Sequence, residues 1–201
     1  MFTYLALGDS YTIGEQVPAV ENFPHQTVML LRREYVTQVA DPHIVAVTGW
    51  TTDELAAAIK EAGIRDTFDV VTLLIGVNNQ YRGRDLENYK REFAQLLNKA
   101  ILFANGRTAR VFVLSIPDWG ATPFAEGRDR TTIAAEINAF NMANRAIALA
   151  YKCHYVDITA STRQHGTDEQ YLTPDKLHYS GKEYHEWALK LAPGMAAALK
   201  S

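Results

Sequence analysis

The chain has 201 residues, a formal net charge of −3, and hydrophobic and charged shares of 47% and 21%, so we expect one folded domain over residues 1–201. It contains no cluster of lysine and arginine, which argues against a nucleic acid partner, and its one cysteine, Cys153, excludes an internal disulfide and a thiolate metal site. No run reaches the roughly 18 apolar residues of a membrane-spanning helix, and we see no signal peptide, so we expect no integral membrane segment and a cytoplasmic protein, although a secreted form without its leader would look the same.

Short apolar runs rich in β-branched residues recur along the chain, each followed by a longer segment of helical periodicity. The predicted strands are Phe2–Leu7, His43–Val47, Val70–Ile75, Arg110–Leu114 and His154–Ile158. The predicted helices cover 23–36, 55–62, 85–104, 131–151 and 181–199. Capping boxes at Thr51–Glu54 and Ser180–Glu183 are expected to begin two of these helices.

This alternation predicts a flavodoxin-like α/β fold, a three-layer α/β/α sandwich around a five-stranded parallel sheet of order 2-1-3-4-5. In such sheets ligands bind beyond the carboxyl ends of the strands, where the winding reverses. That point lies beside the first strand, which leads into "LALGDSYTIG". The longest irregular stretches, 116–130 and 159–179, join the same edge to the following helices, and residues 117–130 are long enough to cover the site.

Ser10 is the candidate nucleophile because it directly follows the first strand. A nucleophilic serine needs a base and a group that orients the base. In "TPDKLHYSGKE", Asp175 precedes His178 by three residues, which would place both on one loop. His165 with Asp168 is a rival pair, but no helix start follows it. Taken alone, the motif of Asp175 and His178 is a weak signal, because local turn hydrogen bonds explain it more readily than a catalytic role does.

Donors for an oxyanion are expected from the strands on either side of the first one. Gly49 follows the second strand and can expose its backbone N–H, while Asn78 follows the third strand and carries a side-chain amide. Together with the N–H of Ser10 they could face one carbonyl oxygen. Each also has a structural interpretation, Gly49 as a turn glycine and Asn78 as a cap. Ser115, at the fourth strand, lacks glycine neighbours and is interpreted as structural.

These blocks resemble the SGNH hydrolases, also called the GDSL-like lipase/esterase family. "GDS" carries Ser10, Gly49 stands at the glycine donor, "GVNN" carries Asn78, and "DKLH" carries Asp175 and His178, in family order. The resemblance implies the same three-layer fold and an ester substrate hydrolysed through an acyl-enzyme. It also implies no cofactor and no metal.

Two residues depart from the family pattern. Asn79 stands where an aspartate is usual, which puts the support of that loop in question, and Tyr11 stands where a leucine is usual. Tyr11, Trp50, Trp119 and Phe124 lie near the predicted catalytic edge and are candidates for lining the substrate pocket. The resemblance leaves short-chain acyl esters, acetylated sugars and lysophospholipids open as substrates.

A non-catalytic carbohydrate or small-molecule binding domain on the same fold is the alternative hypothesis. The sequence has no Gly-x-Ser-x-Gly motif, which disfavours an α/β-hydrolase with its nucleophile elbow. Neither Gly-x-Gly-x-x-Gly nor a P-loop follows the first strand, which disfavours a nucleotide-binding protein. Because every catalytic role has a candidate residue, we expect an esterase. The sequence assigns no protein partner.

Overall fold

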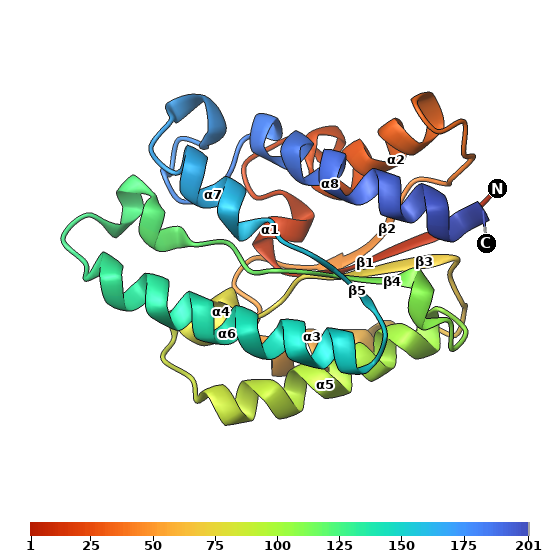
Figure 1. Cartoon of the computed structure of the whole chain (residues 1–201), viewed down its shortest axis with the longest axis horizontal. Coiled ribbons are helices and arrows are strands. Elements are labelled where there is room, and N and C mark those ends of the chain that lie inside the picture. Colours follow the sequence, from red (N-terminus) through yellow and green to blue (C-terminus); the bar gives the residue numbers. More distant parts are fainter. Residues whose placement is uncertain (201) are drawn as a thin grey trace.

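A computed structural model describes residues 1–200, which form a five-stranded sheet enclosed by helices (Figure 1). All strands are parallel and their order is β2-β1-β3-β4-β5, which confirms the predicted fold class and strand order. The strands are β1 (Tyr4–Gly8), β2 (His43–Ala46), β3 (Val70–Leu73), β4 (Val111–Leu114) and β5 (His154–Val156).

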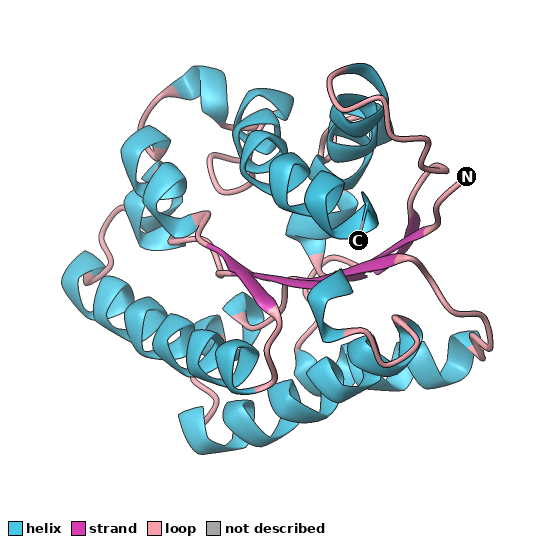
Figure 2. Ribbon diagram, turned by 45° about the vertical axis from the view of Figure 1, so that its right-hand side comes forward, coloured by secondary structure: helices cyan, strands magenta, loops and turns pink. Residues whose placement is uncertain are grey.

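Helices cover both faces of this sheet, as Figure 2 shows. The layer above the sheet in Figure 1 contains α1 (Ser10–Ile13), α2 (Phe23–Arg33), α7 (Thr159–His165) and α8 (Gly181–Lys200). The layer below contains α3 (Thr52–Ala62), α4 (Val77–Tyr81), α5 (Leu86–Phe103) and α6 (Arg130–Ala150). The 3-10 turns are η1 (Ala19–Glu21), η2 (Thr108–Arg110), η3 (Trp119–Ala121), η4 (Pro123–Ala125) and η5 (Glu169–Tyr171). None of the helices that residues 1–200 form has the length and apolar content needed to cross a lipid bilayer.

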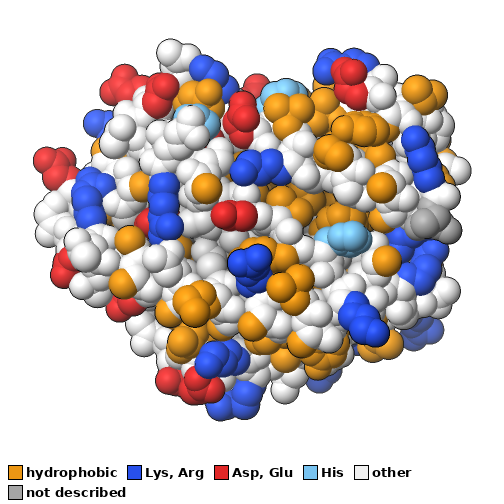
Figure 3. Space-filling model, viewed as in Figure 1, with side chains coloured by type: hydrophobic (Ala, Val, Ile, Leu, Met, Phe, Trp, Pro, Cys, Tyr) orange, Lys and Arg blue, Asp and Glu red, His pale blue; other side chains and the backbone are white. Residues whose placement is uncertain are grey.

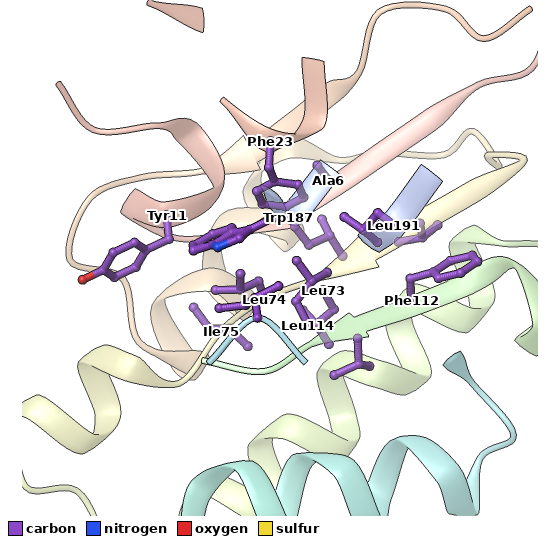
Figure 4. Close-up of a cluster of buried hydrophobic side chains, with 14 of the residues drawn as sticks. Ala6, Tyr11, Phe23, Leu73, Leu74, Ile75, Phe112, Leu114, Trp187 and Leu191 are labelled. Atoms are coloured by element: carbon purple, nitrogen blue, oxygen red, sulfur yellow. The ribbon is translucent and has the colours of Figure 1, made fainter. Parts of the chain in front are cut away.

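The strands are continuous apolar runs because both faces of a parallel sheet are covered by helices. Every residue of β1, β3 and β4 is buried. In Figure 4, Trp187 of α8 and Phe23 of α2 lie over Leu73 and Leu114 of the sheet. Burial of side chains of this size contributes roughly 1.5–3 kcal/mol each, so packing holds the carboxyl ends of the strands in a fixed arrangement.

The segment 159–179, expected to be irregular, is partly helical, since it contains α7 and η5. The N–H of Thr159 at the start of α7 donates to Asp157 Oδ1 at 2.8 Å, a local bond that hydrophobic periodicity does not reveal. The predicted helix 23–36 is shorter than expected and ends at Arg33. Val36 adopts a φ of +51°, which no continuing α-helix can accommodate.

One of the two predicted capping boxes is wrong. The box at Thr51–Glu54 forms, with the N–H of Thr51 donating to Glu54 Oε2 at 2.8 Å. At Ser180–Glu183, the N–H of Ser180 instead donates to a carbonyl of η5 at 2.9 Å. The carboxylate of Glu183 is turned inward and fully buried, where it binds His165 and Trp187. Tertiary partners have replaced the local bond at this helix start.

Candidate active site

Ser10 lies just beyond the carboxyl end of the inner strand β1, at the start of α1, and is 3% exposed. Asp9 caps this short helix, because its Oδ1 accepts the N–H of Tyr11 at 3.0 Å. A Cβ at Gly8 would collide with Thr12 Oγ1, so only glycine permits this tight strand-to-helix turn. The turn directs the hydroxyl of Ser10 to the edge where ligands bind in such sheets.

The loop before α8 brings His178 and Asp175 to Ser10, 168 residues away from His178 in the chain. His178 Nε2 lies 3.1 Å from Ser10 Oγ, and His178 Nδ1 lies 2.6 Å from Asp175 Oδ2. The other carboxylate oxygen, Oδ1, accepts the backbone N–H groups of His178 and Leu177, each at 2.9 Å. The loop therefore curls around the carboxylate and leaves one oxygen for the imidazole.

Asp175 is held in its ionised form. Burial opposes ionisation, but hydrogen bonds from the His178 ring, from the backbone of His178 and Leu177, and from Thr173 outweigh it and lower the pKa of Asp175 to about 2. A carboxylate at Nδ1 orients the imidazole so that Nε2 faces the serine hydroxyl, and stabilises the imidazolium that forms if the proton of that hydroxyl is taken.

The two predicted oxyanion donors both reach the pocket that contains Ser10. Gly49 has a φ of +87°, a conformation that favours glycine, and its carbonyl accepts from Arg82 Nη2 at 2.6 Å. Asn78 lies on α4, and its Nδ2 donates to the carbonyl of Trp50 at 2.9 Å. One amide proton is used in that bond, and the second is free to serve a ligand. The side chains of α4 and the loop after β2 thus orient each other.

The pocket has a volume of about 190 Å³. Its lining residues are Ser10, Tyr11, Thr48, Gly49, Val77, Asn78, Tyr81, Trp119, Phe124, Leu177 and His178. Of the four side chains predicted to line it, Tyr11, Trp119 and Phe124 do so. Trp50, which is also among the described residues, does not: it packs against the core and contributes its carbonyl to the bond with the α4 amide.

Val77 and Tyr81 are lining residues that the sequence analysis missed. They stand one residue before and three residues after Asn78, on a helix of five residues, Val77–Tyr81, that hydrophobic periodicity does not predict. Residues three apart on a helix share a face, so recognising this helix would have identified Tyr81 as a neighbour of the amide.

Tyr11 packs against His178. Its ring centroid is 5.2 Å from that of His178 and 5.6 Å from that of Tyr179. Burial raises the pKa of Tyr11 well above its ordinary value, so the phenol stays neutral. In Figure 4 the ring lies at the edge of the core cluster with its hydroxyl directed away from it. The tyrosine that replaces the family leucine therefore supports one face of the imidazole.

Residues 117–130, predicted as a possible cover, are tied to the body of the protein. Asp118 forms an ion pair with Arg163 of α7 at 2.8 Å, and Arg130 Nη1, at the first residue of α6, donates to the carbonyl of Thr122 at 2.9 Å. The N–H of Phe124 donates to the carbonyl of Lys176 in the loop that carries the histidine, at 3.2 Å. The segment forms one wall of the pocket.

Two other candidates have structural partners. His165 Nδ1 lies 2.7 Å from Glu183 Oε2, and that carboxylate takes the place that the rival pair assigned to Asp168. Ser115 Oγ accepts the N–H groups of Ile158 and Thr159, at 2.8 and 3.1 Å. The hydroxyl of this serine therefore joins two loops, as its structural interpretation requires.

A larger cavity of about 690 Å³ lies between α6, β5 and α7 and shares no lining residue with the pocket at Ser10. The face of the molecule on this side carries basic, acidic and apolar side chains in a mixed pattern (Figure 3). Buried Cys153 lines this cavity, and burial raises the pKa of its thiol to about 11. Among residues 1–200, no three His, Cys, Asp or Glu side chains are grouped as a metal site would require.

A match to a known protein family decides which family this chain belongs to. The model of the GDSL-like lipase/acylhydrolase family matches residues 6–185, a span that includes every block described above. The chain belongs to this family. As a GDSL-like hydrolase it is an enzyme that hydrolyses esters, as the resemblance implied. No curated protein matches its sequence significantly.

Solved structures share the fold of this GDSL-like hydrolase at low sequence identity. The lipase Lip_vut3 from a goat rumen metagenome has a TM-score of 0.77 and 20% identity, with 96% of this chain and 97% of that chain covered. TesA has a TM-score of 0.76 and 16% identity, with 98% and 99% covered. The psychrotrophic esterase EstA from Pseudoalteromonas sp. has a TM-score of 0.71 and 14% identity, with both chains covered in full, at 100%.

Proposed function

We propose that this GDSL-like hydrolase is a serine esterase that cleaves carboxylic esters of small molecules through a covalent acyl-enzyme. Ser10 is the nucleophile, His178 the general base and acid, and Asp175 the group that orients the histidine. The observation that carries the proposal is the continuous line of contacts from Asp175 Oδ2 through the imidazole to Ser10 Oγ, at 2.6 and 3.1 Å. Both distances lie within hydrogen-bond reach, the first requirement for a base acting on a nucleophile.

In the acylation step, Ser10 Oγ forms a bond to the ester carbonyl carbon as its proton passes to His178 Nε2. The carbonyl π electrons move to oxygen, and the resulting oxyanion accepts hydrogen bonds from the N–H groups of Ser10 and Gly49 and from the Asn78 amide. The oxyanion then collapses, the bond to the alkoxy oxygen breaks, and the imidazolium returns the proton to the departing alcohol. Asp175 remains ionised throughout.

Deacylation repeats these steps with water. A water molecule gives a proton to His178 Nε2 and bonds to the acyl carbon, the same three donors hold the new oxyanion, and the bond to Ser10 Oγ breaks. The proton on the imidazole goes to the serine oxygen, so the free acid leaves and the enzyme is restored. Short-chain acyl esters, acetylated sugars and lysophospholipids are the substrate classes that this chemistry serves.

The test is covalent labelling by a fluorophosphonate, with hydrolysis of p-nitrophenyl acetate measured in parallel. Wild type should label and turn over, and Ser10→Ala should lose both while its circular dichroism is unchanged. Ser161→Ala, which changes a buried serine on α7 outside the pocket, is the matched control and should keep both. A folded wild type that neither labels nor hydrolyses the ester, or a fully active Ser10→Ala, would overturn the proposal.

A further inference from the structure

The pocket at Ser10 is small and apolar away from the reacting groups. Its volume of about 190 Å³ is below the roughly 300–1,000 Å³ usual for ligand cavities, so it holds one compact group. No Asp, Glu, Lys or Arg among residues 1–200 lines it. A charged or hydroxyl-rich group placed there would lose its hydration without gaining partners.

An aromatic wall, consisting of Tyr81, Trp119 and Phe124, closes this pocket. Trp119 is 3% exposed, whereas Tyr81 and Phe124 are 46% and 39% exposed, so the indole lies deep and the two other rings lie at the rim. The Tyr81 and Trp119 rings meet edge to face at 5.1 Å, and the Trp119 and Phe124 rings do so at 6.1 Å. This is the favoured geometry for aromatic pairs and leaves a rigid apolar surface.

Two successive side-chain hydrogen bonds hold the indole at the depth of the pocket. Trp119 Nε1 donates to Gln80 Oε1 at 2.7 Å, and Gln80 Nε2 donates to Glu136 Oε2 at 2.7 Å. Gln80 is itself 5% exposed, so moving the indole would leave buried polar atoms without partners. Extending the pocket past Trp119 would therefore cost free energy, because the indole would have to leave these partners.

The wall is connected to the side of the site that binds the oxyanion. Tyr81 and Gln80 belong to the same short helix, α4, as Asn78, and Trp119 is bonded to that helix through Gln80. The leaving alcohol must lie toward His178, which returns its proton. Tyr81 and Trp119 therefore lie beside the acyl group. Phe124 extends this surface from Trp119 to the histidine loop, where its N–H donates to the carbonyl of Lys176.

We propose that the aromatic wall sets the acyl specificity of the enzyme, admitting compact, uncharged, apolar acyl groups such as acetyl to butyryl and excluding long chains. This inference rests on the proposed function. The alcohol portion is not limited by the wall, so esters of one short acid with different alcohols should differ little.

Chain-length profiles test this with one leaving group. For wild type, kcat/KM on p-nitrophenyl octanoate should be at least roughly 10-fold below that on the acetate or butyrate. In Trp119→Ala and Phe124→Ala the ratio of octanoate to acetate should rise by about 10-fold, because the wall is opened. Tyr151→Ala removes an aromatic ring of similar exposure, 37% against 39%, that does not line the pocket, and it should leave the ratio unchanged.

The outcomes separate the inference from the proposed function. If wild type hydrolyses no ester and takes no fluorophosphonate label, the proposed function fails. If hydrolysis depends on Ser10 but octanoate and acetate react equally well, or if Phe124→Ala leaves the ratio unchanged, the inference alone fails. Should Trp119→Ala not fold, Phe124→Ala still decides, because its half-exposed ring makes no side-chain hydrogen bond. Strong dependence on the size of the alcohol, in a series of acetate esters whose alcohols have similar pKa values, would also overturn the inference.

Discussion

Asn79 of α4 and Thr52 of α3 exchange two buried hydrogen bonds, which join the two segments that carry the candidate oxyanion donors. The N–H of Thr52 donates to Asn79 Oδ1 at 3.1 Å, and Asn79 Nδ2 donates to Thr52 Oγ1 at 2.7 Å. The Thr52 hydroxyl in turn donates to Glu92 Oε2. Because Glu92 already accepts the hydroxyl proton of Thr52, the side chain at position 79 has to donate to the hydroxyl oxygen, which an amide can do and a carboxylate cannot. The asparagine found where the family has an aspartate is thus matched to Glu92.

Replacing Asn79 by aspartate should therefore damage this clamp. Asn79→Asp places two carboxylates at one hydroxyl, which can donate to only one of them, so we expect the free energy of unfolding to fall by about 1–3 kcal/mol. Since α3 begins at Thr52, three residues after Gly49, kcat should fall by roughly 10-fold as the oxyanion donor is displaced. Urea unfolding and p-nitrophenyl acetate kinetics measure the two effects.

The double variant Asn79→Asp with Glu92→Gln is the control for this prediction. The glutamine amide introduced in place of Glu92 can donate to the Thr52 oxygen, while the hydroxyl proton turns to the new carboxylate that replaces Asn79. Most of both losses should therefore be recovered. If Asn79→Asp alone is as stable and active as wild type, the proposed match between Asn79 and Glu92 is contradicted. A double variant that is no better than the single one would also contradict it.

Asn78→Ala tests the oxyanion donor directly. It removes the amide that we assign to the oxyanion and also frees the carbonyl of Trp50, so kcat should fall by about 10²–10³-fold while KM changes little. Arg82→Ala removes the bond to the Gly49 carbonyl together with an ion pair to Glu54, but it leaves the amide in place and should cost less, roughly 10-fold. Steady-state kinetics on p-nitrophenyl acetate will measure both. Equal losses in kcat and affinity for Asn78→Ala would point to substrate binding instead.

Asp175→Asn tests the orientation of the histidine. The amide cannot accept from Nδ1 in the same way while stabilising an imidazolium, so kcat should fall by about 10⁴-fold, as in other triads. Asp168→Asn, in the rival pair, should leave kcat unchanged, because Asp168 caps η5 and does not contact His165 through its side chain. Comparable activity of Asp175→Asn and wild type in turnover assays would exclude the proposed triad.

Asp9 makes stability depend on pH. Burial raises the pKa of Asp9 from 3.8 to about 7, so the folded state holds this proton more tightly than the unfolded state. Its contribution to stability is complete below the unfolded pKa and is lost as the pH rises through the folded pKa. Asp9→Asn keeps the acceptor for the N–H of Tyr11 but does not titrate. The free energy of unfolding of Asp9→Asn should therefore increase relative to that of wild type as the pH rises, by at most about 4 kcal/mol.

Urea unfolding of both proteins at several values between about pH 4 and pH 8 checks this. The difference in free energy of unfolding should grow steadily in favour of Asp9→Asn over that range. A difference that does not change with pH would show that Asp9 is ionised in the folded protein throughout.

Much of the fold could be predicted from local pattern. Apolar runs alternating with helical periodicity indicate a parallel sheet, and the rule that ligands bind where the winding reverses points to Ser10. Asp175 and His178 are only three residues apart, so a single turn can hold both, and their contact could be predicted from this spacing. The residue type at position 49 was itself informative, because the positive φ of Gly49 favours glycine over every other residue.

Contacts between distant residues had no such signal. Trp50 was assigned to the pocket and Tyr81 was missed, because which ring faces the pocket depends on how α4 packs against the loop after β2. Glu183 has the spacing of a helix cap, yet a buried imidazole and indole offer it stronger partners than the backbone does. Local chain chemistry specifies turns, caps and periodic faces. The direction of each side chain is settled when sheet and helices pack and every buried polar atom needs a partner.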